Sequence, residues 1–385
     1  MLTPINKSII QEPSIHFRNI HSGEVFSDLW KQLEQGLWHD IIPENYEYNI
    51  IQGLLKRPTW KPELKDVFPI YPGMKWCEEK KQLEDPYFIP VKQEACLKDF
   101  LTAAESFFAK YSDRKIGVQL SGGLDSSIII GLLKYFGVPF SLVGMSSDRY
   151  EFRTEKRVQH ILAEWGYPTS LIKYENHLPF FDLEKIPPFQ HPDHLCLNYS
   201  ADNIMAMECK KLGIDVLLTG NGGDNVLAEE VSENPEYCSW RPQIFIDTWL
   251  NDLVYVPQGV KLIPFYGDRQ IMGAIYNLRI GQKEDNTKTW ARNFFKDFLP
   301  IELVNYTYCA DFWGLYISGL QDSLFIARKL CNRAYEFTEH PYFSDIAISE
   351  LFNQDLLNAQ KSMYQKIESR ISLATWLNAL IKMAK

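Results

Sequence analysis

Residues 115–127 read Lys-Ile-Gly-Val-Gln-Leu-Ser-Gly-Gly-Leu-Asp-Ser-Ser, and they give the clearest indication of the fold class. Its first six residues predict a short strand, and the largely apolar segment 126–136 predicts a helix. Two glycines, with serines on both sides, separate the two elements. In open α/β sheets, ligands bind beyond the carboxyl ends of the strands, where a loop leads into a helix. This stretch is therefore a candidate binding loop.

The succession of strand and helix continues along the chain. Further strands are predicted at 140–145, 170–174 and 216–219, and further helices at 96–111, 154–165 and 201–212. Because elements that alternate at this spacing form βαβ units, we expect an α/β fold with a doubly wound, mainly parallel sheet. Beyond about Glu229 the strand signal fades, and a mostly helical C-terminal region is predicted.

Composition divides the chain into two parts and excludes several classes of protein. Residues 1–98 are rich in Pro, Trp and Tyr, and we expect a small β-containing module there, either a remnant or a substrate-binding module. Residues 99–385 form the main domain. The net charge of −9 argues against a nucleic-acid partner, and seven scattered cysteines argue against disulfides or a zinc site. No apolar run approaches the roughly 20 residues of a membrane span, and the N-terminus lacks a secretion signal, so we expect a cytoplasmic protein.

The loop at 121–127 has the chemistry of an anion site. Its glycines let the backbone approach a ligand closely, and the helix start that follows supplies free N–H groups. Asp125 is unexpected beside an anion unless a cation such as Mg²⁺ lies between them. The plain alternative is a tight turn with an acidic residue at a helix start. The lysine of a Walker loop is absent.

A second loop, Thr219-Gly220-Asn221-Gly222-Gly223-Asp224-Asn225, also follows a predicted strand. With it, the sequence resembles the ATP-pyrophosphatase family, and most closely the synthetase domain of asparagine synthetases, whose corresponding loops read SGGLDSS and LSGEGADE. The resemblance covers roughly residues 65–370 and is specific at the two loops. It implies an adenine nucleotide alpha-hydrolase-like fold, with ATP and Mg²⁺ as cofactors.

The resemblance also implies roles for individual residues. Asp125 and Asp224 would share the Mg²⁺ and act in catalysis together with Asn221, and Glu155 matches an acidic position of the family. The residues that would hold pyrophosphate and the adjoining nucleotide are Leu120, Ser121, Gly122, Gly123, Asp125, Ser126 and Ser127. Those that would flank the adenosine are Val143, Met145, Thr219 and Gly220. Lys366, in a K-x-x-x-R stretch, fits the place of a catalytic lysine.

Two departures from the asparagine synthetase pattern bear on the reaction. Residue 2 is Leu in place of the glutaminase cysteine, so no glutamine-derived ammonia is expected. The glutamate between the loop glycines is replaced by Asn221, and an amide cannot act as a general base near neutral pH. Both departures fit β-lactam synthetases and lasso-peptide cyclases better, in which an amine of the same molecule captures an adenylated carboxylate.

We therefore expect an ATP- and Mg-dependent ligase that adenylates a carboxylate, releases AMP and pyrophosphate, and closes an amide, with a macrolactam-forming peptide cyclase as the preferred form. The substrate would be a small molecule or a peptide, and a leader-peptide-binding or protease protein is a possible partner. Two alternatives stay open: ammonia-dependent amide synthesis and a non-catalytic nucleotide-binding partner protein. The aromatic residues of the C-terminal region either line a peptide-sized cleft or pack a helical core.

Overall fold

The computed structural model describes residues 16–19, 21–26, 41–51, 65–70, 75–79, 82–84, 95–189, 192–228, 231, 250–283, 285–305, 312–344 and 361–383. None of the helices within these ranges combines the length and the hydropathy that a membrane span requires. Trp240, one of the aromatic residues of the C-terminal region, lies outside the described residues.

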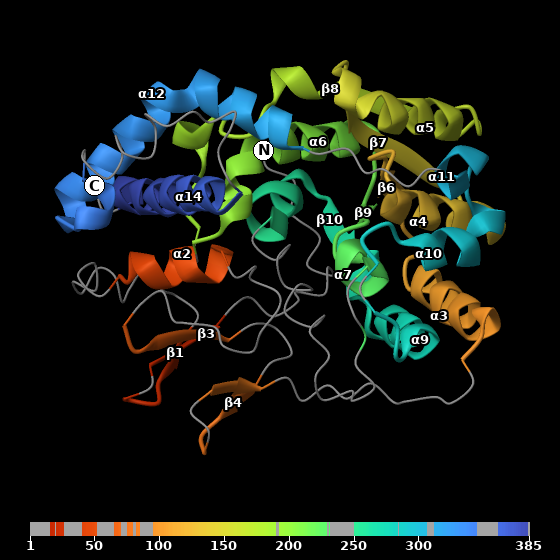
Figure 1. Ribbon diagram of the computed structural model, residues 1–385, viewed down its shortest axis with the longest axis horizontal. Helices are drawn as coiled ribbons and strands as arrows, with labels where there is room; N and C mark the ends of the chain where they lie inside the picture. Colours follow the sequence, from red (N-terminus) through yellow and green to blue (C-terminus); the bar gives the residue numbers. More distant parts are fainter. Residues whose placement is uncertain are drawn as a thin grey trace, which may run out of the picture.

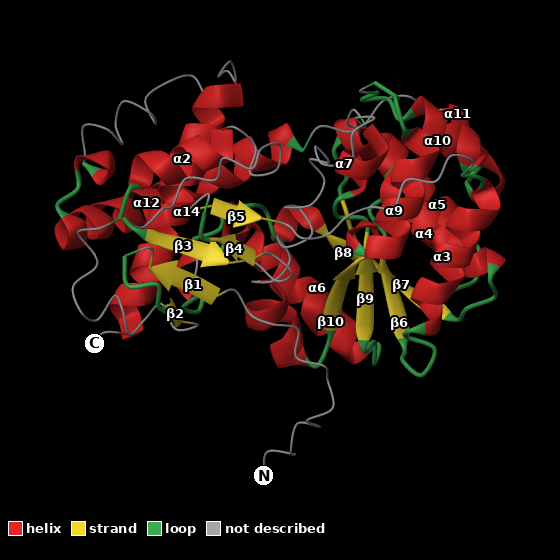
Figure 2. Cartoon of the chain, turned by 90° about the horizontal axis from the view of Figure 1, so that it is seen from below, coloured by secondary structure: helices red, strands yellow, loops and turns green. Residues whose placement is uncertain are grey.

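The centre of the fold is a parallel five-stranded sheet (Figure 2). Its strands are β6 (Ile116–Gln119), β7 (Phe140–Ser146), β8 (Thr169–Lys173), β9 (Val216–Thr219) and β10 (Lys261–Pro264). They lie in the order β10-β9-β6-β7-β8, and every adjacent pair is parallel. The chain adds β7 and β8 on one side of β6 and β9 and β10 on the other. This is the doubly wound α/β fold that the sequence predicts, with its topological switch point between β6 and β9.

Alternating side chains of the strands feed two separate cores. On β9, Val216 and Leu218 lie in the core that contains α4, whereas Leu217 lies in the core of the opposite face. Leu142 and Val143 on β7 divide in the same way. Because successive side chains of a strand point to opposite faces, one short apolar strand supplies both layers.

Helices cover both faces of the sheet (Figure 1). The first face is covered by α3 (Leu97–Ala109), α4 (Leu124–Tyr135), α5 (Arg153–Ala163), α7 (Gly223–Ala228), α9 (Arg269–Arg279), α10 (Thr289–Phe294) and α11 (Ile301–Asn305). The second face is covered by α6 (Tyr199–Lys211), α12 (Trp313–Thr338) and α14 (Lys361–Met383). The short helical turns are Tyr150–Phe152, Tyr174–Asn176, Leu183–Lys185, η5 (His194–Asn198), Asn251–Tyr255, Val256–Gln258, η10 (Phe265–Gly267), Lys296–Phe298 and Pro341–Phe343.

The N-terminal part contributes a small β structure and one packed helix. Its strands are β1 (His16–Asn19), β2 (Val25–Phe26), β3 (Val67–Ile70), β4 (Lys75–Cys77) and β5 (Gln82–Glu84). They form an antiparallel three-stranded sheet, β2-β1-β3, and a β4-β5 pair, as the β-containing prediction required. Helix α2 (Pro43–Ile51) lies against α14, where Tyr46 Oη and Ser372 Oγ are 2.9 Å apart in the interior.

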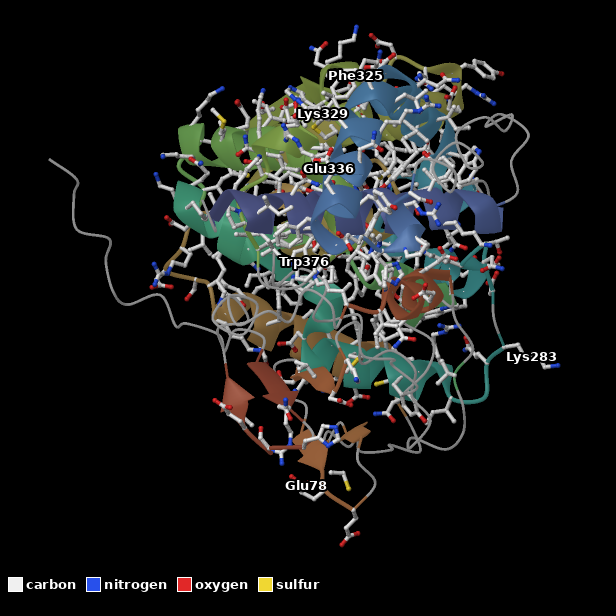
Figure 3. All side chains as sticks on the ribbon, turned by 90° about the vertical axis from the view of Figure 1, so that its left-hand side faces the viewer. Glu78, Lys283, Phe325, Lys329, Glu336 and Trp376 are labelled. Atoms are coloured by element: carbon white, nitrogen blue, oxygen red, sulfur yellow. The ribbon has the colours of Figure 1, made fainter. Side chains whose placement is uncertain are left out.

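The C-terminal helices α12 and α14 lie side by side, and both contribute side chains to the core of the second face. Trp376 on α14 is 1% exposed, and its Nε1–H donates to the carbonyl of Phe189 at 2.9 Å. Phe325 on the outer side of α12 is 77% exposed (Figure 3). The mostly helical C-terminal region agrees with the sequence prediction.

One strand was missed at the sequence level. The strand signal of the sequence fades beyond Glu229, yet β10 lies there and pairs in parallel with β9. Its sequence, Lys-Leu-Ile-Pro, is too short to show a strand period. The strand is fixed instead by a distant side chain: the Asn251 amide donates to the Leu262 carbonyl at 2.7 Å and accepts from the Leu262 N–H at 2.6 Å. The Asn251 side chain thus forms hydrogen bonds with the backbone of β10 in the way that a neighbouring strand would.

Candidate functional site

Two glycine-containing loops meet at the switch point of the sheet. One joins β6 to α4 through residues 120–123, and the other joins β9 to α7 through residues 220–222. A Cβ atom on Gly220 would lie 2.9 Å from the Ser126 nitrogen, and one on Gly223 would lie 2.5 Å from the Asp125 Cγ. The second loop needs glycine at these positions because it packs directly on the start of α4.

Hydrogen bonds within the loop after β6 fix its conformation. Ser121 Oγ accepts from the Gly123 N–H at 3.1 Å and lies 2.7 Å from Ser126 Oγ. Ser127 is buried, and its hydroxyl donates to the Gly123 carbonyl at 2.7 Å. Gly123, which precedes the first residue of α4, has no side chain to cap the helix. The first-turn N–H groups of α4 are therefore free to meet a ligand.

Gly122 has a left-handed backbone, with φ of +82°, and lies against α5. A Cβ atom there would collide with the backbone carbonyl of Glu155. Glycine is therefore required at this position both by conformation and by space.

The two predicted acidic residues, Asp125 and Asp224, both contact one cation, the ammonium of Lys288. Its Nζ is 2.7 and 2.8 Å from the two carboxylate oxygens of Asp125 and 2.6 Å from Asp224 Oδ1. The Lys288 side chain is 4% exposed and Asp125 is 19% exposed, whereas Asp224 is 84% exposed at the rim. The two carboxylates are thus close enough to share a single positive ion.

Burial and charge act on this cluster in opposite directions. Burial raises the pKa of Asp125, against the opposing effect of the Lys288 ammonium. For Lys288, burial acts to lower the pKa, but Asp125 and Asp224 outweigh it and raise the pKa to about 12. Burial also raises the pKa of Tyr266 well above its usual value, so its hydroxyl stays protonated and donates to the Asp125 carbonyl at 3.0 Å. Lys288 is accordingly a permanent cation at neutral pH.

Two adjoining cavities open at these loops. The first, which we call the loop pocket, has a volume of about 420 Å³ and contains both aspartates. The second, the inner pocket, has a volume of about 220 Å³ and lies at the ends of β6 and β7. The residues common to both walls are Gln119, Ser121, Leu195, Asn221 and Phe312. Because they share these residues, the two cavities can hold two parts of one ligand.

The inner pocket is lined by apolar and polar side chains in similar number. Met145, Phe152 and Leu315 supply apolar surface. Gln159 is 2% exposed, and its Nε2 donates to the carbonyls of Leu120 at 2.9 Å and Met145 at 2.7 Å. The Gln159 side chain therefore ties the carboxyl ends of β6 and β7 together. This combination is typical of a pocket for a flat, partly polar small molecule.

The predicted site residues are distributed over these cavities as follows. The loop pocket is lined by Ser121, Gly123, Asp125, Ser126, Gly220, Asn221 and Asp224. The inner pocket is lined by Leu120, Met145 and Glu155, with Ser121 and Asn221 on the shared wall. Gly122, Ser127, Val143 and Thr219 are buried behind the walls and support them. Lys366 lies exposed on α14 and is not among the residues that line either cavity.

The aromatic residues of the C-terminal region mostly pack the interior. Tyr255, Phe265 and Tyr266 are each at most 1% exposed. Phe312 differs, because it is 47% exposed and stands on the wall that both cavities share.

Lys288 contacts both predicted acidic residues and was not among the predicted site residues. It lies 163 positions after Asp125, outside any family motif that the sequence displays. The one local signal is Asp285-Asn286-Thr287-Lys288-Thr289, a polar turn directly before a helix. Such a turn is common on protein surfaces, and it does not indicate a buried lysine.

One comparison with known proteins finds a similarity over the residues that contain both loops. The family model of asparagine synthase matches residues 109–248, a range that contains both loops but neither Lys288 nor Lys366. A search of curated proteins finds no match. Among solved structures, an NMN synthetase from Francisella tularensis matches with 10% identity, 54% coverage of this chain, 91% coverage of that chain and a TM-score of 0.24. Residues 109–248 are thus similar to the asparagine synthase family of ATP-dependent ligases.

Proposed function

We propose that this chain is an ATP-dependent ligase that activates a carboxylate as its adenylate and joins it to an amine. The observation that carries the proposal is the meeting of two glycine loops at the switch point, with Asp125 and Asp224 within reach of one cation. In an open α/β sheet this is where ligands bind. The match of residues 109–248 to the asparagine synthase family supports the same reaction class.

The two cavities suit the two halves of ATP. The loop pocket, with Ser121, Ser126 and the start of α4, offers hydroxyl and N–H donors to a triphosphate. The inner pocket, with Met145 and Phe152, offers apolar surface to the adenosine. Asn221 and the other shared wall residues would lie near the α-phosphate, where the two halves join.

The acidic pair fits a Mg²⁺ that arrives bound to the triphosphate. Asp125 and Asp224 supply oxygen ligands, and Asp224 is exposed to solution. Among the described residues no group of three or more acidic, histidine or cysteine side chains could hold a metal, so phosphate oxygens would complete the coordination. When bound there, the ion neutralises charge on the triphosphate.

The reaction has two steps. A substrate carboxylate oxygen attacks the α-phosphorus, an acyl adenylate forms, and pyrophosphate leaves against the N–H groups at the start of α4. An amine then attacks the acyl carbon and displaces AMP. The amide of Asn221 cannot take the proton of the amine, so this proton passes to the departing phosphate group of AMP or to solvent. The second step then depends mainly on positioning, for which effective molarities of about 10⁵ M or more are known.

We propose an intramolecular amide, such as a macrolactam in a peptide, as the product, formed as in lasso-peptide cyclases or β-lactam synthetases. Supporting observations are Asn221 in place of the family glutamate and the half-exposed Phe312 at the mouth of both cavities. With a peptide substrate, a leader-peptide-binding or protease protein would act as a partner of this chain. Ammonia-dependent amide synthesis is the second candidate, since the same acyl adenylate serves both reactions.

The test uses ¹⁸O-labelled carboxylate in a panel of peptides that carry an acidic side chain and a free amine. Adenylation transfers one ¹⁸O atom from the carboxylate to AMP, which mass spectrometry detects. We expect labelled AMP together with pyrophosphate. ADP and phosphate as products, or AMP that carries no label, would refute adenylation. Aspartate with ammonium in place of the peptide tests the second candidate.

A further inference from the structure

Lys288 combines an unfavourable backbone conformation with a buried charged side chain. It has a left-handed backbone, with φ of 52° and ψ of 39°, directly before the first residue of α10. Residues other than glycine rarely adopt this conformation, because their side chains strain it. A lysine side chain is also seldom buried. Both features together indicate that the surroundings hold Lys288 in place.

A network of hydrogen bonds fixes the turn that carries Lys288. The Asp285 carboxylate accepts from the Thr287 N–H at 3.0 Å, the Thr287 hydroxyl at 2.5 Å and the Thr289 N–H at 2.7 Å. The Asp285 N–H donates to the Ala228 carbonyl at 2.7 Å, and Trp290 Nε1 donates to the Leu227 carbonyl at 2.7 Å. The turn is therefore bound to α7, the helix whose second residue is Asp224.

The ammonium of Lys288 uses its three protons on the two aspartates. Its three contacts, two to Asp125 and one to Asp224, are all between 2.6 and 2.8 Å. An ammonium has three donors and no acceptor, so the group is saturated. Two carboxylates and one ammonium leave a net charge of −1 at the loop pocket. A free divalent cation would therefore have to displace Lys288 before it could reach both carboxylates.

We propose that Lys288 is a counter-cation built into the nucleotide site, which holds Asp125 and Asp224 in the unliganded enzyme and transfers to the pyrophosphate part of ATP when a metal-bound nucleotide takes the two carboxylates. The inference rests on the proposed function. Its physical basis is exchange of partners: the ion brings positive charge to the carboxylates, and the phosphates offer new acceptors to the released ammonium. Lys288 thereby excludes the ion alone and favours the ion with its nucleotide.

The test measures two affinities in the full-length protein: Mn²⁺ alone, by electron paramagnetic resonance, and inorganic pyrophosphate with Mn²⁺, by calorimetry. In Lys288→Met we expect Mn²⁺ alone to bind at least tenfold more tightly than in the wild type. Pyrophosphate should bind at least tenfold more weakly. Lys288→Arg, which keeps the charge, should bind pyrophosphate more tightly than Lys288→Met. The control is Lys283→Met, since Lys283 is exposed and points away from the molecule (Figure 3).

If Lys288→Met does not fold, Asp125→Asn/Lys288→Met removes one buried charge of each sign and is compared with Asp125→Asn alone. We expect pyrophosphate affinity to fall at least tenfold between these two variants. Equal affinities, or Mn²⁺ binding to the wild type as tightly as to Lys288→Met, would show that Lys288 only neutralises the acidic pair. If the wild type and Lys288→Met bind ATP and pyrophosphate equally well, this inference alone is overturned. If the wild type binds neither ligand, the proposed function is overturned.

Discussion

At the scale of single residues, Asp125 connects the loop, the acidic pair and the buried lysine. Asp125→Asn keeps the shape of the side chain but removes the charge that faces Lys288 at 2.7 Å. We expect the rate of pyrophosphate release to fall by about 10³-fold, which corresponds to roughly 4 kcal/mol of transition-state stabilisation. The measurement is a coupled pyrophosphate assay with the peptide substrate and saturating ATP.

The matched control is Asp113→Asn, because the Asp113 side chain is 74% exposed and pairs with its neighbour Arg114 at 3.6 Å. Its rate should stay within about twofold of the wild type, since surface ion pairs contribute little. If Asp125→Asn retained a comparable rate, the carboxylate would have no part in the reaction.

How far the site could be predicted from sequence depends on chain distance. Asp125 and Asp224 follow strands, and parallel strands end at one edge of the sheet, so their approach could be expected. The sequence shows that Gly220 and Gly223 belong to a loop. The structure shows why glycine is needed there, because a Cβ atom would collide with Ser126 or Asp125. Lys288 could not be predicted because no periodic pattern links a turn before α10 to a loop before α4.

At the scale of elements, the packing of α12 offers a test of stability. Gly319 lies where a Cβ atom would collide with the backbone carbonyl of Pro179, whereas at Gly314 it would meet only the flexible ends of Glu151 and Arg149 at 3.0 and 3.1 Å. We expect Gly319→Ala to lower the free energy of unfolding by about 1–3 kcal/mol. Chemical denaturation monitored by circular dichroism measures it.

Gly314→Ala, in the same helix, provides the comparison. Because its neighbours can move, we expect a change within about 0.5 kcal/mol of the wild type. Equal effects of the two substitutions would mean that α12 does not press on the backbone at Pro179.

The turn η5 carries a group that makes stability depend on pH. Burial lowers the pKa of His194 to about 4 from 6.5. Between these values the unfolded state binds more protons than the folded state, so stability decreases as pH falls from about 6.5 to about 4. The side chain is 27% exposed, and we expect a loss on the order of 1–2 kcal/mol.

The measurement is denaturation across this pH range for the wild type and His194→Gln. The variant cannot be protonated there, so its stability should depend less steeply on pH. Burial also lowers the pKa of His177, so some dependence should remain in the variant. Identical slopes in the two proteins would contradict the assignment to His194.

The elements themselves were predictable where periodicity is strong. The strands at β6, β7, β8 and β9 lie within one or two residues of their predicted bounds, and the helices α3 to α6 follow the predicted positions. Strand β10 was not predictable, since Asn251 and pairing with β9 create it. Tertiary contacts determine such a strand, and four residues carry no period of their own.

At the scale of the whole molecule, distant parts of the chain build one structure around the sheet. Helix α2 of the first 98 residues packs on α14 near the C-terminus, with Tyr46 and Ser372 in contact. The core of the second face unites these helices with α6, β9 and β10. Helix α2 lies before residue 98 but shares its core with the C-terminal helices. The division of the chain at residue 98, which rests on composition, stays a prediction.

The central claim is that the switch point binds the triphosphate of ATP across the two loops. The most direct measurement is calorimetric titration with the Mg²⁺ complex of α,β-methylene ATP, which cannot be cleaved at the bond in question and needs no second substrate. We expect a dissociation constant of roughly micromolar, about −8 kcal/mol, with competition by pyrophosphate and at least tenfold weaker binding in Asp125→Asn. No binding to the wild type, or binding that pyrophosphate and Asp125→Asn leave unchanged, would contradict it.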